Sequence, residues 1–189
     1  MNILEVQNLC KVYGAGEAAV HALNQVSFSV RRGEFIAIVG ESGSGKSTLL
    51  NIVGALDDPT SGSVRIDGKD VFSLSEKELT VFRRQHIGFI FQSFNLIPEL
   101  DVEQNMIFPL LLDYKVPDKR FVEELLHVLG LTERRKHLPG QLSGGQQQRV
   151  AIGRVSSWRT SRRGIWTAKT ARKSLRSCNP CRPNISRRS

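Results

Sequence analysis

A glycine-rich stretch near residue 40 is the feature that most constrains how this chain can fold. It reads Gly40-Glu41-Ser42-Gly43-Ser44-Gly45-Lys46-Ser47 and fits the pattern G-x-x-x-x-G-K-S/T. The continuous apolar run before it, Phe35 to Val39, predicts a strand buried on both faces of a parallel sheet, and Lys46 to Leu56 after it predicts a helix. A strand, a glycine-rich loop and a helix in this order form the context in which the pattern binds phosphate. The alternative, a merely flexible glycine loop, would not need these flanking elements.

The residue types in this stretch suit the tail of a nucleoside triphosphate. Glycines let the backbone curl until successive N–H groups point at phosphate oxygens, and the helix start adds the positive end of its dipole. Lys46 is predicted to reach the β- and γ-phosphates, and the Ser47 hydroxyl is predicted to ligate Mg²⁺. The residues predicted to bind the nucleotide here are Gly40, Ser42, Gly43, Ser44, Gly45, Lys46, Ser47 and Thr48. On its own the loop could serve a kinase, a GTPase, a helicase or a transporter ATPase.

The charge is divided unevenly along the chain. The 189 residues carry a formal net charge of +9, which by itself would suggest nucleic-acid binding. Residues 155–189 hold ten of the 27 Lys and Arg and none of the 18 Asp and Glu, so residues 1–154 are close to neutral. This tail contains no recognisable nucleic-acid-binding module. We therefore expect no nucleic-acid partner, and a basic nucleic-acid-binding protein is the least favoured alternative.

The sequence shows no sign of membrane insertion or of export. It contains no run of 18 or more apolar residues, and its N-terminus opens with strand-like alternation instead of a charged segment followed by an apolar one. We expect a cytoplasmic protein. Cys10 is interpreted as a small core residue. Cys178 and Cys181 could form a redox pair or half of a zinc site, but no second pair or later histidine accompanies them.

Periodicity predicts the strands, and capping residues predict the helices. Alternation of apolar and polar residues indicates strands at Ile3 to Leu9, Val26 to Val30 and Ser63 to Asp67, and a short apolar run indicates another at Ile87 to Phe91. Ser75 with Glu78 forms a capping box that predicts a helix to about Gln85, and a helical pattern begins after Val102. Pro117 is predicted as a first helical residue and Gly130 as a helix end. Ser143 is predicted as the N-cap of a helix that runs to about Arg154.

A second motif selects among the families that share the phosphate loop. Leu142-Ser143-Gly144-Gly145-Gln146, continued by 147–154, resembles the signature of ABC transporter ATP-binding domains. The alternative, a serine-capped helix after a glycine linker, explains the cap but not the phosphate loop upstream. The resemblance implies a head-to-tail homodimer in which the signature serine and glycine N–H groups close on the ATP held by the partner's phosphate loop. It also implies ATP and Mg²⁺ as ligands.

The same resemblance assigns roles to two further residues. Tyr13 stands where the family places an aromatic ring that stacks on adenine, although it could be a strand-edge tyrosine. Gln92 stands where the family has a glutamine that contacts Mg²⁺ and couples to the membrane domains, although it could be a surface glutamine. The resemblance therefore implies Ser47 and Gln92 as the Mg²⁺ contacts. Residues 93–140 match the helical subdomain, which in this family faces the membrane helices of the transporter.

The resemblance also implies a fold, a subfamily and partners. Leu56 to Gly62 and Ile87 to Pro98 are similar to the group that serves macrolide export, lipoprotein release and peptide-antibiotic resistance. We expect an α/β fold with the P-loop NTPase core of ABC type, an antiparallel β subdomain, an α-helical subdomain and a parallel sheet that is incomplete at its C-terminal side. Residues 1–154 would form this ATP-binding domain, with transmembrane permease subunits as partners at the inner face of the cell membrane. The transported substrate is not encoded in this chain.

The family's catalytic segment is missing after residue 154. No Asp or Glu follows Glu133 and no His follows His137, so the Walker B aspartate, the catalytic glutamate and the switch histidine have no counterpart. From Ser157 onward, the codon junctions read one base earlier permit Leu-Ala-Asp-Glu-Pro-Thr-Gly-Asn-Leu-Asp-Ser-Lys, with Trp158 and Trp166 fixing two of them. We predict a frameshift with a small deletion after Arg154, and a disordered, non-native tail at 155–189. The resemblance implies an ABC-type ATPase that couples ATP binding and hydrolysis to export or extraction of a substrate by the membrane subunits. A nucleotide-binding remnant without turnover is the alternative function.

Overall fold

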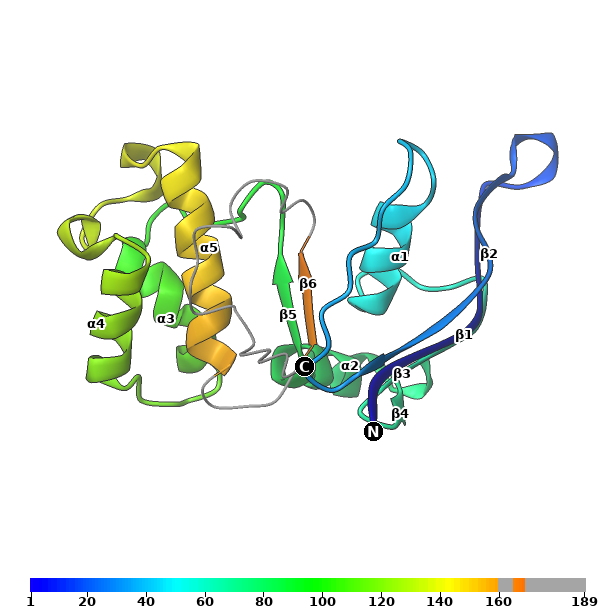
Figure 1. The fold of residues 1–189 in the computed structure, drawn as a ribbon, viewed down its shortest axis with the longest axis horizontal. Helices are drawn as coiled ribbons and strands as arrows, with labels where there is room; N and C mark the ends of the chain where they lie inside the picture. The colour runs from blue at the N-terminus through cyan, green and yellow to red at the C-terminus, as the bar shows by residue number, and fades with distance from the viewer. Residues whose placement is uncertain (160–164, 169–189) are drawn as a thin grey trace, which may run out of the picture. The chain divides into compact units, whose positions relative to one another are not determined.

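The computed structural model describes residues 1–159 and 165–168, and the chain divides into two compact units. Unit 1 spans Met1–Gly88 and unit 2 spans Phe89–Ser189. Figure 1 shows that unit 1 carries the longest strands and unit 2 is built mainly from helices. No helix among the described residues is both long and apolar enough to cross a membrane.

Unit 1 is built around an antiparallel sheet of four strands. The strands are β1 (Asn2–Tyr13), β2 (Val20–Arg31), β3 (Ser61–Ile66) and β4 (Lys69–Asp70), in the spatial order β2-β1-β3-β4. Val6 of the central strand pairs with Phe28 on one side and with Val64 on the other. The predicted strands Ile3 to Leu9, Val26 to Val30 and Ser63 to Asp67 are therefore confirmed, and the antiparallel β subdomain with them.

Two helices accompany this sheet. α1 (Lys46–Val53) buries Leu49, Ile52 and Val53, and it ends three residues before the predicted Leu56. α2 (Glu76–His86) begins as its capping box predicts. The Ser75 hydroxyl accepts a hydrogen bond from the Glu78 backbone N–H, and the Glu78 carboxylate accepts one from the Ser75 N–H at 2.9 Å. A short 3-10 helix lies in the hairpin between β1 and β2 (η1, Gly16–Ala18) and another before α2 (η2, Val71–Ser73).

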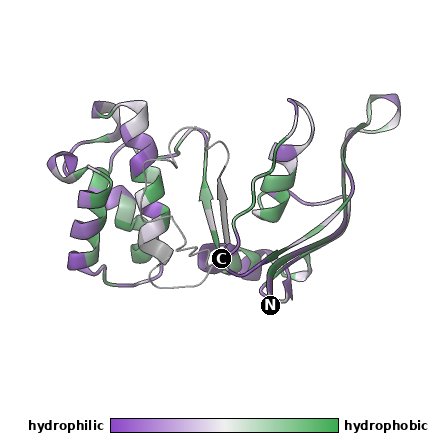
Figure 2. Cartoon of the chain, viewed as in Figure 1, coloured by the Kyte–Doolittle hydropathy of each residue, from purple (hydrophilic) through white to green (hydrophobic). Residues whose placement is uncertain are grey.

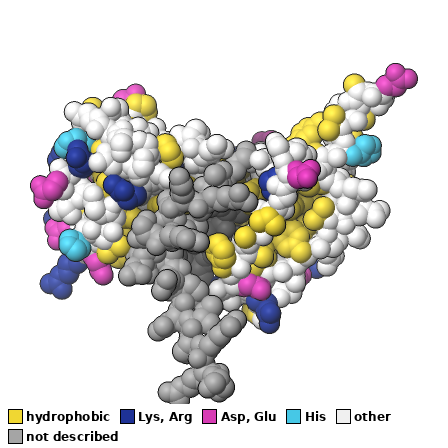
Figure 3. Space-filling view, turned by 45° about the horizontal axis from the view of Figure 1, so that its top comes forward, with side chains coloured by type: hydrophobic (Ala, Val, Ile, Leu, Met, Phe, Trp, Pro, Cys, Tyr) yellow, Lys and Arg dark blue, Asp and Glu magenta, His cyan; other side chains and the backbone are white. Residues whose placement is uncertain are grey.

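The predicted buried strand Phe35 to Val39 is wrong as a description of this structure. The segment belongs to neither sheet of the described residues. Phe35 is 75% exposed and Val39 is 78% exposed. Figure 3 shows hydrophobic side chains, in yellow, exposed over the unit that carries α1 and the four-stranded sheet. A buried parallel strand needs neighbours on both edges, and the described residues provide none beside this segment.

Unit 2 is a helical bundle with its own core. Its helices are α3 (Val102–Leu112), α4 (Lys119–Val128) and α5 (Gly144–Arg159), with short 3-10 helices η3 (Thr132–Arg134) and η4 (Pro139–Gln141) before α5. α3 and α4 both pack against α5. Figure 2 shows hydrophilic and hydrophobic residues on different sides of α4, whose buried residues include Val122, Leu125 and Leu126. The core cluster comprises Val102, Met106, Val122, Leu125, Leu126, Leu129, Leu131, Leu142, Val150 and Ile152.

The ends of α4 test two predicted boundary residues. Gly130, with φ of +63°, follows the C-cap Leu129 as predicted. Pro117 is not the first helical residue, because Asp118 is the N-cap and α4 begins at Lys119. The Asp118 carboxylate accepts a hydrogen bond from the Arg120 N–H at 3.0 Å, and this side-chain cap sets the start of the helix.

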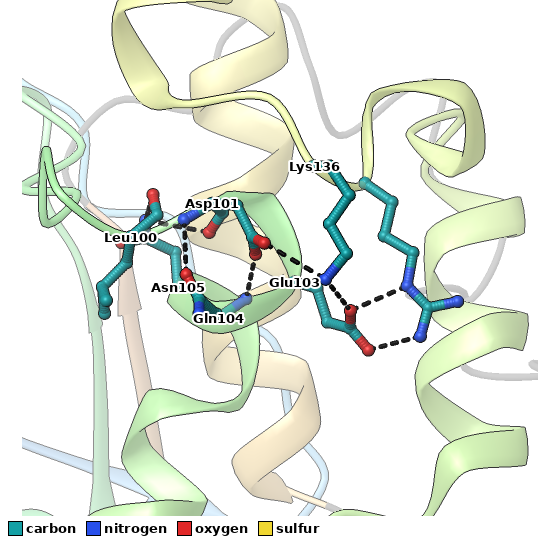
Figure 4. A network of polar contacts seen from close by, with 7 residues as sticks. Leu100, Asp101, Glu103, Gln104, Asn105 and Lys136 are labelled. Carbon is teal, nitrogen blue, oxygen red and sulfur yellow. Dashed lines mark hydrogen bonds and ion pairs between the residues drawn. The ribbon is translucent and has the colours of Figure 1, made fainter.

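A buried asparagine fixes the loop that enters α3. Asn105 is 1% exposed. Its Oδ1 accepts a hydrogen bond from the Ile97 N–H at 2.8 Å, and its Nδ2 lies 2.7 Å from the Leu100 carbonyl oxygen, 3.0 Å from that of Ile97 and 3.1 Å from that of Asp101. Figure 4 shows Asn105 beside Leu100 and Asp101 at the start of α3. The amide thus replaces the regular backbone partners that a loop lacks.

An ion-pair network lies on the same helix start, as Figure 4 also shows. Glu103 accepts hydrogen bonds from Arg135 at 2.7 Å and from Lys136 at 3.2 Å, and Lys136 also reaches Asp101 at 3.3 Å. The hydrogen bond from Arg135 is the main reason that the pKa of Glu103 lies below its ordinary value. The network joins the start of α3 to the segment before η4.

A two-stranded sheet pairs β5 (Ile87–Ile90) with β6 (Ile165–Ala168). β5 confirms the short strand predicted at Ile87 to Phe91. α5 runs to Arg159 instead of ending near Arg154, and β6 lies within the predicted tail, so two elements extend beyond residue 154. The remaining tail residues, with Cys178 and Cys181, lie outside the described residues. Cys10 is half-buried instead of fully buried, and its sulfur accepts a hydrogen bond from the Gln25 N–H at 3.2 Å.

Candidate functional site

The predicted phosphate loop lies immediately before α1 in unit 1. Gly45 is the N-cap of α1 and has φ of +81°, a left-handed conformation that favours glycine. A Cβ atom at Gly45 would lie 2.2 Å from the backbone oxygen of Ala22 in β2. The loop therefore lies against β2 so closely that only glycine fits at this position.

The Lys46 side chain folds back into the loop. Its Nζ donates a hydrogen bond to the Glu41 carbonyl oxygen and lies 3.1 Å from the Ser44 hydroxyl oxygen. The ammonium group thus contacts two oxygen acceptors from residues that precede it in the loop. A phosphate oxygen would be one more acceptor of the same kind, and a charge-assisted hydrogen bond to it is about twice as strong as a neutral one.

The start of α1 supplies backbone donors to the same place. The first intrahelical bond at this end joins the Leu49 N–H to the Gly45 carbonyl at 2.8 Å. The N–H groups of Lys46, Ser47 and Thr48 come before it and have no acceptor within the helix. The Ser47 side chain is exposed beside them, so its hydroxyl is accessible to a cation. This donor set fits a triphosphate, and one serine hydroxyl with phosphate oxygens fits Mg²⁺.

Tyr13 is the last residue of β1 and lies beside β2, the strand that the phosphate loop approaches. It pairs with Val20, which is two residues before Ala22, the residue whose carbonyl meets Gly45. Two residues of strand span about 7 Å, a distance comparable with the length of a nucleoside. The Tyr13 side chain is 40% exposed, so its ring is accessible. The placement fits the predicted stacking of Tyr13 on a base bound above the phosphate loop.

Gln92 occupies a turn directly after β5. The residue is exposed and belongs to unit 2, whereas Ser47 belongs to unit 1. The predicted pairing of Ser47 and Gln92 around Mg²⁺ therefore stays a prediction. Among the residues that the structure describes, no group of three or more His, Cys, Asp or Glu side chains could hold a metal ion.

The predicted signature forms the start of α5, as its sequence indicates. The Ser143 hydroxyl accepts a hydrogen bond from the Gln146 N–H at 3.4 Å, and the Gln146 side chain accepts one from the Ser143 N–H at 2.8 Å. Leu142 is buried, whereas Ser143, Gly144 and Gly145 are exposed. A Cβ atom on either glycine would meet nothing within 4 Å. The helix start is therefore accessible, with its N–H groups and a serine hydroxyl at the surface.

Two residues near these elements have contacts that the sequence did not indicate. The Asp57 carboxylate accepts hydrogen bonds from Tyr13 at 2.6 Å and from Lys11 at 2.7 Å. Arg154, on α5, donates to the carbonyl oxygens of Phe94 at 3.0 Å and Asn95 at 2.6 Å. Each contact joins residues more than forty positions apart in the sequence, so no local pattern could have revealed it.

The chain resembles a known protein family and several of its members over most of its length. The profile of the family described as ABC transporter matches residues 23–161. The lipoprotein-releasing system ATP-binding protein LolD of Geobacter metallireducens is 50% identical over 160 residues, which cover 82% of this chain and 69% of LolD. The macrolide export ATP-binding/permease protein MacB of Mannheimia succiniciproducens is 47% identical over 157 residues, which cover 82% of this chain but only 24% of MacB.

A solved structure gives the same result for the fold. The ATP-binding cassette MJ0796, determined as a dimer in a post-hydrolysis state with ADP and Pi, superimposes with a TM-score of 0.73 at 34% identity. The match covers 93% of this chain and 90% of the MJ0796 chain. The α/β fold expected from the phosphate loop and the signature is thereby confirmed as that of an ATP-binding cassette.

Proposed function

The chain belongs to the ABC transporter family, and we propose that it acts there as an ATP-binding subunit whose nucleotide state drives partner membrane subunits. In this proposal Gly40 to Thr48 hold the triphosphate, Tyr13 stacks on the base, and Ser47 with Gln92 contacts Mg²⁺. The partners would be permease subunits at the inner face of the cell membrane. The similarity to LolD and MacB supports this class of partner, and the transported substrate would be chosen by the permease.

The observation that carries the proposal is the phosphate loop in front of α1. Lys46, the N–H groups at the start of α1 and the close approach of Gly45 to β2 together place hydrogen-bond donors and a positive charge at one end of α1. The N–H donors need no rearrangement to bind a polyphosphate, because the helix backbone already holds them, and the Lys46 ammonium would exchange its loop acceptors for phosphate oxygens. Bound Mg²⁺ would neutralise part of the triphosphate charge.

The exposed helix start at Ser143 supports a dimer in which two chains share their nucleotides. Its serine hydroxyl and free N–H groups form a second anion site that lies far along the sequence from the phosphate loop. MJ0796 was determined as a dimer with ADP and Pi. We propose that the Ser143 site closes on the terminal phosphate held by the partner chain, so that nucleotide binding and dimer formation are coupled.

A second candidate is a chain that binds nucleotide without turning it over. Hydrolysis needs a carboxylate or a similar group to orient the attacking water, and the sequence has no Asp or Glu after Glu133. Our frameshift hypothesis accounts for that composition. Reading the gene across codons 150–190 tests it, and bases that do not spell the Ala-Asp-Glu-Pro segment in the other frame would refute it.

The decisive experiment measures Mg·ATP binding by the purified chain. We expect Lys46→Ala to weaken binding about ten- to hundredfold, the effect of losing a charge-assisted hydrogen bond. Lys77→Ala is the matched control, because Lys77 is an exposed lysine of α2 in the same unit, and it should leave the affinity unchanged. Equal affinities for wild type and Lys46→Ala would refute the proposal.

Phosphate release distinguishes the two candidates, and the oligomeric state tests the shared nucleotide site. Turnover that depends on Lys46 supports the transport ATPase, and binding without turnover supports the second candidate. Size-exclusion chromatography with and without Mg·ATP tests the shared site. We expect a nucleotide-dependent dimer that Ser143→Ala weakens, and a dimer indifferent to both nucleotide and Ser143 would contradict the proposed coupling.

A further inference from the structure

Three side chains at the end of β1 form a closed polar group. The Tyr13 hydroxyl donates to Asp57 Oδ2 at 2.6 Å, and Lys11 Nζ donates to Asp57 Oδ1 at 2.7 Å. Lys11 Nζ also lies 4.8 Å from the centroid of the Tyr13 ring, within cation–π range. We name Lys11, Tyr13 and Asp57 the Tyr13 clamp.

Backbone bonds hold Asp57 in place for this role. Asp57 follows α1, and the next residues are tied to β1. Lys11 Nζ donates to the Asp58 carbonyl oxygen at 2.6 Å, the Val12 N–H donates to the Thr60 hydroxyl oxygen at 2.9 Å, and the Thr60 N–H donates to the Cys10 carbonyl oxygen at 2.9 Å. The carboxylate therefore cannot swing away from Tyr13 without breaking a connected set of hydrogen bonds.

The clamp restricts the Tyr13 ring in two ways. The hydrogen bond to Asp57 fixes the direction of the phenol, which would otherwise sample several rotamers at an exposed hairpin. Lys11 occupies one face of the ring. A planar base can therefore stack on the opposite face, onto a ring that is already oriented.

We propose that Asp57 is a positioning residue for nucleotide recognition, which holds the Tyr13 ring by its hydroxyl so that the free face receives the base. This inference rests on the proposed function. It predicts that the Tyr13 hydroxyl increases the affinity for the nucleotide, although the stacking of the ring on a base does not itself require a hydroxyl. Ordering a side chain on binding weakens affinity by about two- to tenfold, and removal of the anchor should show a loss of this size.

The experiment compares Mg·ATP with Mg·tripolyphosphate, which lacks the base, as competitors of a fluorescent N-methylanthraniloyl-ATP bound to the full chain. We expect Asp57→Ala and Tyr13→Phe each to weaken Mg·ATP binding about two- to tenfold. The double variant should lose no more than either single variant, because both remove the same hydrogen bond. The affinity for Mg·tripolyphosphate should stay within about twofold of wild type, since no base is present to be stacked.

Asp57→Asn serves as the conservative variant, because its amide oxygen can still accept the tyrosine hydroxyl, and it should retain most of the affinity lost in Asp57→Ala. The inference is wrong if Asp57→Ala binds Mg·ATP like wild type, or if it weakens the binding of Mg·ATP and of Mg·tripolyphosphate equally. It is also wrong if the double variant loses affinity by the product of the two single-variant losses. Lys46→Ala, measured in parallel, keeps the two proposals apart. Binding that depends on Lys46 but not on Asp57 rejects the clamp alone, and binding that does not depend on Lys46 rejects the proposed function.

Discussion

Replacing Asn105 by alanine should destabilise the helical unit more than any exposed polar substitution. Asn105 is 1% exposed, and its side chain bonds the loop between Ile97 and Asp101. In Asn105→Ala the Ile97 N–H loses its acceptor and the Leu100 carbonyl loses its donor, whereas the Ile97 and Asp101 carbonyls keep the backbone N–H groups of Leu100 and Asn105. Backbone polar groups left unpaired in this half-buried loop are costly.

The magnitude follows from the count of hydrogen atoms. The amide oxygen accepts one hydrogen bond, and the amide nitrogen has two hydrogens for the three carbonyl oxygens within 3.1 Å, so one of these contacts is shared. Three effective hydrogen bonds at about 1 kcal/mol each give a loss of about 3 kcal/mol in the free energy of unfolding. With a urea m-value of about 2 kcal/mol/M, the midpoint should fall by about 1.5 M.

Urea unfolding followed by circular dichroism at 222 nm is the appropriate assay. The helices α3, α4 and α5 belong to unit 2, so most of the helical signal reports the unit that contains Asn105. Asn24→Ala is the control, because Asn24 is an exposed asparagine of β2, and it should change stability by less than about 0.5 kcal/mol. If Asn105→Ala unfolds at the same urea concentration as Asn24→Ala, the loop bonds do not stabilise unit 2.

Three further outcomes are expected. Gly45→Ala should destabilise the chain by at least about 2 kcal/mol in urea unfolding and abolish Mg·ATP binding, because the new Cβ would clash with the Ala22 backbone. Gly43→Ala is the control, because its Cβ would meet nothing and only the conformational penalty of a positive φ remains. Equal losses of stability in the two variants would contradict this reasoning. Hydrogen bonds from Lys11 and Tyr13 lower the pKa of Asp57 from its ordinary value of 3.8. The contribution of Asp57 to stability is therefore present above pH 3.8 and is lost as the pH falls through the lower pKa of the folded state. Asp57→Asn should reduce the slope of the unfolding free energy against pH in this acid range, and an unchanged slope would refute the contribution. Val39→Lys should leave stability within about 0.5 kcal/mol, because Val39 is already exposed. The same change should reduce self-association measured by light scattering, because it places a charge in the exposed apolar segment Phe35 to Val39. Unchanged self-association would show that chains do not associate through this segment.

Features that depend on neighbours in sequence could be predicted. The Ser75–Glu78 capping box, the Ser143 cap and the glycine at the start of α1 are determined within a few residues, and the structure places each as expected. The antiparallel strands were also predictable, because apolar alternation specifies which face of each strand is buried.

Features that depend on distant partners could not be predicted. The apolar composition of Phe35 to Val39 specifies a buried strand only if other strands flank it, and the described residues place none there. The hydrogen bond of Tyr13 to Asp57 depends on how the end of α1 meets β1, which no local pattern encodes. Pro117 was misassigned for a smaller reason, since the next residue is a carboxylate that caps α4.

Arg154 gives the helical unit a mechanical property. Phe94 and Asn95, which follow Gln92 closely, both have left-handed φ values, 62° and 45°, and such conformations persist only where the surroundings hold them. The Arg154 guanidinium holds both carbonyls from α5, the helix that begins beside Ser143. The turn of Gln92 cannot shift relative to that helix without breaking two charge-assisted hydrogen bonds. A displacement of the segment after Gln92 would therefore be opposed by a bond to α5, the helix whose first turn follows Ser143.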